Sequence, residues 1–260
     1  MAHHEQFIKS VILKRGAVGS FDSYPFSIPA VRHLDELRFP TPATFFVGEN
    51  GSGKSTLLEA LAVAAGLNAE GGSRNFRFAT RATHSKLSDY LRLLRAPRRP
   101  TDAYFLRAET FYNVASAAEQ YGVAEQHGGG KSPHEQSHGE SFMALVLHRL
   151  RGNGLYLFDE PEAALSPTRQ LSLLAAMHQL VASGSQFIIA THSPILLDIR
   201  TLPSTISTMR ESEQLPTPTL STMSSLVRSS EIRVGCYASC SRATMTYLIA
   251  TSPERRGGWA

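Results

Sequence analysis

The chain has 260 residues, of which 42% are hydrophobic, and this is enough to bury one full core. Its formal net charge of +4 comes from 26 Lys/Arg against 22 Asp/Glu, so overall charge says little about a partner. No run of about 18 apolar residues could span a bilayer, and no secretory segment follows Met1. We therefore expect a soluble, cytoplasmic protein without membrane insertion. The two cysteines, Cys236 and Cys240, are too few for a four-thiolate zinc site, and we interpret them as incidental thiols.

Hydrophobic periodicity predicts strands and helices in alternation along most of the chain. The expected strands are Phe7–Arg15, Tyr24–Val31, Thr44–Val47, Ala103–Leu106, Leu155–Phe158 and Gln186–Ala190. The expected helices are Leu57–Ala65, Lys86–Arg95, Phe142–Leu150 and Pro167–Val181. Apolar strands separated by helices predict an α/β fold with a mostly parallel sheet that is covered on both faces. We expect Tyr24–Val31 to be the neighbour of Phe7–Arg15.

A glycine-rich segment lies between a predicted strand and a predicted helix and fits the pattern G-x-x-x-x-G-K-[ST]. Its residues are Gly48, Glu49, Asn50, Gly51, Ser52, Gly53, Lys54, Ser55 and Thr56. Such a loop turns consecutive backbone N–H groups inward, and the following helix start adds partial positive charge. Lys54 is then placed to reach the β and γ phosphates, and the Ser55 hydroxyl to bind Mg²⁺. The segment predicts a binding site for ATP or GTP.

Two acidic residues, Asp159 and Glu160, end the apolar run Leu155–Phe158. Ligands of open α/β sheets bind at the carboxyl ends of strands, and Pro161 forces a turn at this point. Both carboxylates can therefore reach one site. We expect Asp159 to hold Mg²⁺ and Glu160 to orient and deprotonate an attacking water.

Two further motifs stand in a fixed order around these acids. Ser137-His138-Gly139-Glu140-Ser141 opens a predicted helix upstream, and Thr191-His192-Ser193-Pro194 follows the strand Gln186–Ala190. With them, residues 7–198 resemble the ABC-type ATPases. The glycine-rich segment corresponds to Walker A, Ser137–Ser141 to the signature motif, Asp159-Glu160 to Walker B, Ala164–Ser166 to the D-loop, and His192 to the switch histidine.

The resemblance implies a P-loop NTPase fold with antiparallel N-terminal strands and a small helical lobe. It also implies an ATPase with Mg²⁺ that works as a homodimer, in which two ATP molecules are sandwiched between two protomers. The signature residues Ser137, His138, Gly139 and Glu140 would then cap the γ-phosphate that Lys54 of the opposite protomer holds. Glu160, His192 and Lys54 would be the catalytic residues. Asn50 and the string Asp-Glu-Pro-Glu-Ala-Ala-Leu-Ser-Pro are similar to the RecF, SMC and OLD-like branch.

The sequence departs from the family pattern at several positions. Gln136 and His138 replace the usual leucine and glycine of the signature, and Ser166 stands where the transporter D-loop has aspartate. No glutamine sits where the family's Q-loop is expected, directly after the strand Ala103–Leu106. The polar candidates for this coupling loop are Arg107, Glu109 and Asn113. An aromatic residue that stacks on adenine is not evident, with Phe21 and Tyr24 as candidates.

A basic segment and a histidine-containing loop leave alternatives open. Residues 74–99 carry eight Lys/Arg against Asp89 alone, which fits either nucleic-acid phosphates or a solvated helix face. The histidines at 127, 134 and 138 lack a recognisable metal-ligand spacing, and a mobile signature loop is the better interpretation.

We expect an ATPase domain over residues 1–198, with its basic helical lobe at about 68–140. Residues 199–260 contain 20 Ser/Thr and no Lys, Asp, Asn, Phe or His, so we expect a poorly ordered tail that does not complete the core. The predicted function is ATP hydrolysis coupled to an unidentified task, with DNA maintenance or defence favoured. The alternatives are an ABC transporter's ATP-binding subunit and an ATP-dependent binding module that does not hydrolyse.

Overall fold

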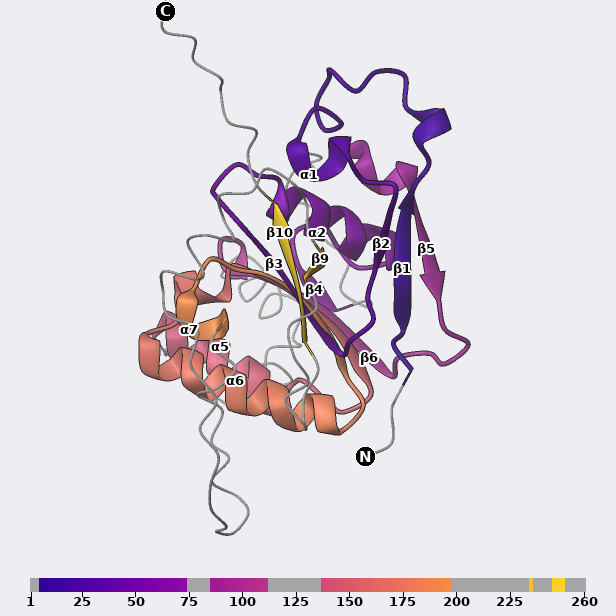
Figure 1. The fold of residues 1–260 in the computed structure, drawn as a ribbon. Helices are drawn as coiled ribbons and strands as arrows, with labels where there is room; N and C mark the ends of the chain where they lie inside the picture. Colours follow the sequence, from indigo (N-terminus) through magenta and orange to yellow (C-terminus); the bar gives the residue numbers. More distant parts are fainter. Residues whose placement is uncertain (1–4, 74–84, 112–136, 198–233, 236–244, 251–260) are drawn as a thin grey trace, which may run out of the picture.

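The computed structural model describes residues 5–73, 85–111, 137–197, 234–235 and 245–250, the last two ranges as backbone only. Its central feature is a seven-stranded sheet in the order β4-β6-β7-β8-β3-β10-β9 (Figure 1). The strands are β3 (Ala43–Gly48), β4 (Gly72–Ser73), β6 (Asp102–Arg107), β7 (Gly154–Asp159), β8 (Gln186–Ala190), β9 (Val234–Gly235) and β10 (Met245–Ala250). β6, β7, β8, β3 and β10 pair in parallel, whereas β4 and β9 pair antiparallel at the two edges. The predicted, mostly parallel sheet is confirmed.

The middle strands are buried along their whole length. Every residue of β7 and β8 is buried, as the continuous apolar runs in these segments predict for strands covered on both faces. One face packs on helix α2 (Lys54–Ala64), and its core cluster includes Phe46, Leu61 and Leu157. The other face packs on α5 (His138–His148) and α6 (Pro167–Ala182) (Figure 1).

A second, three-stranded sheet lies beyond α2. It has the order β2-β1-β5, built from β1 (Ile8–Leu13), β2 (Glu36–Arg38) and β5 (Leu91–Arg95), and both pairings are antiparallel. The buried side chain of Gln186 joins the two sheets, because its amide accepts a hydrogen bond from the Ile8 N–H and donates one to the Ile8 carbonyl, each at 2.9 Å. Antiparallel strands at the N-terminus are thus confirmed, but the partners of β1 are β2 and β5 and not the predicted Tyr24–Val31.

Two predicted elements are wrong in type. Lys86–Arg95 is a short 3₁₀ helix, η2 (Lys86–Tyr90), followed by strand β5, and not one helix. Its leucines fit a helical spacing, but the pairing of Leu91–Arg95 with β1 decides the outcome. Tyr24–Val31 is not a strand but a series of turns that leads into the short helix α1 (Pro29–Arg32), with Pro29 at its first position. The rest of the predicted helical lobe, at 74–84 and 112–136, lies outside the described residues.

The remaining elements are short. They are η1 (Arg15–Ala17), η4 (Pro161–Ala164) and α7 (Pro194–Leu197). In the C-terminal segment, Met245–Ala250 forms β10 and pairs with all six residues of β3, whereas we expected residues 199–260 not to complete the core. The other residues of that segment, apart from β9, are outside the described part, and the domain division at residue 198 stays a prediction.

Candidate nucleotide-binding site

The glycine-rich loop connects β3 to α2, as the sequence predicts. Gly51 and Gly53 adopt left-handed backbone conformations, with φ of 80° and 95°. A Cβ atom on Gly53 would lie 2.1 Å from Cγ2 of Ile28, so both the backbone and the available space require glycine there. The loop leads into the first turn of α2, an 11-residue helix. The N–H groups of a helix's first turn lack partners within the helix, and together with the helix dipole they favour binding of an anion.

Lys54 is the first residue of that helix, and its side chain is buried. Its ammonium group donates hydrogen bonds to the carbonyls of Gly48 at 2.7 Å and Glu49 at 3.0 Å, both within the same loop. The cation is thus held against the loop backbone. Two backbone carbonyls are neutral partners, so a phosphate would be a stronger one for the same ammonium.

Asp159 ends β7 at the carboxyl edge of the sheet, and it is 5% exposed. Burial raises the pKa of its carboxyl to about 6, while a hydrogen bond with Ser55 and the nearby Arg107 lower it by less. The structure therefore brings together Ser55, from the start of α2, and Asp159, from the end of β7. These are the two residues that the sequence predicts to hold one metal ion.

The pair fits a magnesium ion on the chemistry of its donors. Atom Oδ1 of Asp159 is buried and has no hydrogen-bond partner, and the Ser55 hydroxyl lies beside the same carboxylate. Mg²⁺ prefers oxygen ligands and commonly takes one or two protein side chains together with substrate phosphates. Within the described ranges, no group of three or more His, Cys, Asp or Glu side chains could hold a metal by itself. Ser55 and Asp159 could accordingly hold Mg²⁺ together with the phosphates of a nucleotide.

Arg107 links this edge of the sheet to helix α2. It ends β6 and is the register partner of Asp159 on β7. Its guanidinium lies 2.7 Å from the carboxylate of Glu59 on α2 and 3.4 Å from that of Asp159. Glu109 is a more distant partner at 3.7 Å. From the sequence, Arg107 and Glu109 were only polar candidates for a coupling loop. The third candidate, Asn113, lies outside the described residues.

Glu160 occupies the sharp turn that ends β7. It has a left-handed backbone, with φ of 47° and ψ of 53°, which is unusual for a residue with a side chain. Its N–H donates to the carbonyl of Ala190 on β8 at 2.9 Å, and Pro161 follows at the start of η4. The turn leaves the Glu160 side chain 31% exposed, and its Oε1 lies 3.7 Å from Nδ1 of His192. The two predicted catalytic side chains are thus neighbours at the same edge.

Glu162 contacts the same histidine but was not predicted. Its carboxylate accepts hydrogen bonds from the Thr191 hydroxyl and the His192 N–H, both at 2.8 Å. In the sequence, Glu162 is visible only as the second glutamate of Asp-Glu-Pro-Glu, and its spacing from the other motifs does not indicate a role.

The signature segment begins α5. The N–H and hydroxyl of Ser137 donate to the Glu140 carboxylate at 3.0 and 2.8 Å, and these bonds lower the pKa of Glu140. Arg169, from α6, donates to both residues. Gly139 is buried beside Arg169 and the Ala164 carbonyl, which leaves no room for a Cβ atom. His138 is the first residue of the helix, and His127 and His134 lie outside the described residues.

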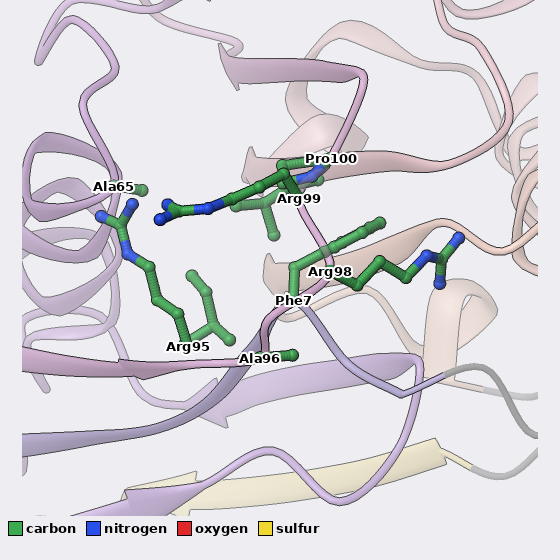
Figure 2. A pocket seen from close by; sticks show the side chains of 9 residues that line it. Phe7, Ala65, Arg95, Ala96, Arg98, Arg99 and Pro100 are labelled. Carbon is green, nitrogen blue, oxygen red and sulfur yellow. The ribbon is translucent and has the colours of Figure 1, made fainter.

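The other candidate residues are exposed or serve structural contacts. Phe21 packs beneath the guanidinium of Arg15, and Tyr24 is exposed. In the described part of the basic segment, Arg95 donates to the carbonyl of Ala64, and Arg98 lies over the ring of Phe7. Figure 2 shows a small pocket here, with Arg95 and Arg99 extending toward Ala65 and Arg98 turned to the other side. Arg95 and Arg98 thus connect neighbouring elements, whatever else this segment binds.

No helix in the described part of the chain is long and apolar enough to cross a membrane.

Comparisons with known proteins place two family models on the chain. One, described as "AAA domain, putative AbiEii toxin, Type IV TA system", matches residues 97–198, and another, described as "AAA domain", matches residues 19–121. Together they include the glycine-rich loop, the acidic edge and His192.

One curated relative is the pyoverdine export ATP-binding/permease protein PvdT of Pseudomonas entomophila (strain L48). It is 26% identical over 204 residues, which are 68% of this chain and 30% of the relative, so the chain spans less than a third of that protein. Among solved structures, the SMC head domain from Thermotoga maritima aligns with 15% identity and a TM-score of 0.38, over 74% of this chain and 91% of that one.

Proposed function

We propose that the chain is a P-loop ATPase of the ABC and SMC-like type, which binds ATP with Mg²⁺ and hydrolyses the bond between the β and γ phosphates, and the two matching AAA-domain models support this proposal. The observation that supports this best is a contact between two distant parts of the sequence. The hydroxyl of Ser55, which follows the buried Lys54 at the start of α2, forms a hydrogen bond with the carboxyl of Asp159 at the end of β7, and one oxygen of that carboxyl is buried without a partner. These residues supply a cation for phosphate and two oxygen ligands for the metal.

Each residue has a defined part in the proposed reaction. Lys54 exchanges its two loop carbonyls for phosphate oxygens, and the N–H groups of residues 51–56 surround the phosphates. Ser55 and Asp159 hold Mg²⁺, which when bound neutralises charge that develops on the phosphates. Glu160, partly exposed beyond the metal ligand, orients the attacking water and accepts its proton. His192 contacts the γ-phosphate from the neighbouring strand end.

In the proposed mechanism a second copy of the chain covers the bound nucleotide. Ser137 is exposed at the start of an 11-residue helix, where a hydroxyl and backbone N–H groups can receive a phosphate of the partner's nucleotide. In the free chain the N–H and hydroxyl of Ser137 donate to the carboxylate of Glu140, so this helix start already binds a negatively charged group. We propose an ATP-dependent homodimer on this basis.

The task coupled to hydrolysis has two candidates. The Asn50 loop and the Asp-Glu-Pro-Glu string favour DNA maintenance or defence, and the matched family's description mentions a type IV TA system. Transport is the alternative, because PvdT is by name an export ATP-binding/permease protein. A binding module that does not hydrolyse ATP would show no turnover at all.

The test compares wild type with Glu160→Gln in size exclusion and in an ATPase assay. We expect the variant to run as a dimer with Mg-ATP and to lose about 10²–10⁴-fold in turnover, since the base is gone but the binding groups remain. Glu36→Gln, the same change on the exposed strand β2, is the matched control and should behave as wild type. Unchanged turnover in Glu160→Gln would refute the assigned role, and a monomer under every condition would refute the dimer. Double-stranded DNA added to the wild-type assay tests the first task through stimulation of turnover.

A further inference from the structure

Glu162 is a buried carboxylate in the short helix η4, next to the strand end that carries His192. Its side chain is 8% exposed. Atom Oε1 accepts the Thr191 hydroxyl and the His192 N–H, while atom Oε2 is buried without a hydrogen-bond partner. In the described part of the chain, His192 is the only basic side chain within ion-pair distance of this carboxylate. The carboxylate of Glu162 is therefore buried although it accepts only these two hydrogen bonds.

The two bonds observed at Oε1 do not need a charge. A glutamine at this position would offer its amide oxygen to the same hydroxyl and the same N–H. What glutamate adds is its negative charge, and a buried charge is costly unless it acts on a partner. The candidate partner is the imidazole of the same histidine whose backbone Glu162 already holds.

The imidazole lies with one nitrogen facing two carboxylates. Nδ1 of His192 is 3.4 Å from Oε1 of Glu162 and 3.7 Å from Oε1 of Glu160. Two acceptors beside Nδ1 favour a proton on that atom, because an unprotonated nitrogen would present a lone pair to negative charge. The ring is half exposed, so Nε2 remains available for another contact. With a proton on both ring nitrogens, Nδ1–H faces the two carboxylates and Nε2–H can donate to a phosphate oxygen.

We propose that Glu162 is a positioning residue for ATP hydrolysis, which fixes His192 by its backbone N–H and keeps a proton on Nδ1 by its charge. This rests on the function proposed above, since His192 is there the γ-phosphate contact. Glu162 itself touches no phosphate. It joins the turn after Asp159-Glu160 to the end of β8, so that both approach the nucleotide as one unit.

The first experiment is steady-state ATP hydrolysis by Glu162→Gln, His192→Ala and the double variant. Removing the group that orients a histidine commonly costs about 10- to 100-fold, and we expect a similar fall in kcat with little change in KM. In the His192→Ala background, Glu162→Gln should have no further effect, because it acts through that side chain. Wild-type kcat in Glu162→Gln, or an equal loss in both backgrounds, would overturn the proposal. Glu36→Gln serves again as the control, and thermal unfolding verifies that each variant is folded.

The second experiment does not depend on hydrolysis. The imidazole nitrogen resonances of His192, assigned by comparison with His192→Ala, report which ring nitrogen carries a proton. We expect a protonated Nδ1 in the free wild-type protein and a changed pattern in Glu162→Gln. The same pattern in both proteins would overturn the proposal. An inactive wild type with the expected pattern would contradict the proposed function and not the effect of Glu162 on the ring.

Discussion

Replacing Arg107 with methionine removes the cation that lies between two buried carboxylates. Arg107 contacts Glu59 on α2 at 2.7 Å and Asp159 on β7 at 3.4 Å. Methionine keeps much of the length of the side chain but leaves both acids without this partner. Burial raises the pKa of Asp159 to about 6 while Arg107 lowers it, so removing Arg107 raises this pKa further, and the repulsion between the two acids grows as the pH rises above 6.

The magnitude follows from how deeply the three groups are buried. The side chains of Arg107, Glu59 and Asp159 are 18%, 14% and 6% exposed. Removing one partner of such a buried pair costs about 3–5 kcal/mol, and we expect the lower end because water can reach Glu59. For a domain of this size each kcal/mol lowers Tm by about 2–4 °C. The fall in Tm should be roughly 6–12 °C.

Thermal and denaturant unfolding without nucleotide measure this loss. The control is Arg38→Met, which breaks the Arg38–Glu36 pair at 3.0 Å on an exposed strand. An exposed pair is worth about 0–1 kcal/mol, so the control should change little. Adding Glu59→Gln to Arg107→Met should recover part of the loss, since one of the two carboxylates is then neutral. A loss no larger than that of the control would refute the idea that Arg107 neutralises this edge.

Two further predictions concern the same edge. Asp159 has a pKa of about 6 in the folded chain against an ordinary 3.8, so the folded state binds more protons between these values and its stability falls as pH rises toward 6. Asp159→Asn should remove that dependence and stabilise the metal-free protein by about 3 kcal/mol at pH 7.5 but little near pH 4, and equal stability at both pH values would contradict it. Gly53→Ala should cost more than about 2 kcal/mol, because φ of 95° is unfavourable and the new Cβ meets Ile28. Gly51→Ala, with φ of 80° but open space, should pay only the backbone cost, and equal losses would argue against the contact with Ile28.

Local sequence patterns were sufficient for the elements that carry the site. The strand–loop–helix around Lys54 and the strand before Asp159 were predicted because one motif and one apolar run specify each. The segment Lys86–Arg95 was mispredicted because its leucines satisfy a helical spacing, and the partner that makes Leu91–Arg95 a strand lies about 80 residues away. β10 was missed for a related reason, since its place beside β3 is a long-range pairing within a segment of atypical composition.

The same distinction applies to the site residues. Asp159 and Glu160 were recognised because they follow a buried strand at the sheet edge where ligands bind. Glu162 was not recognised, because it bonds to the hydroxyl of Thr191 and the backbone N–H of His192. A hydrogen bond to a residue distant in the sequence leaves no pattern of hydrophobic periodicity from which it could be predicted. Arg107 was noted as polar, but only the parallel register of β6 and β7 places it opposite Asp159.

The most direct test of the account is the affinity of Lys54→Ala for Mg-ATP, measured by calorimetry beside wild type. The ammonium now bonded to Gly48 and Glu49 would make charge-assisted bonds to phosphate, which are worth about 1.5–3 kcal/mol. We predict binding weaker by at least about tenfold in a variant that still unfolds cooperatively. Binding of Mg-ATP to Lys54→Ala as tight as to wild type would contradict the assignment of this loop as the phosphate site.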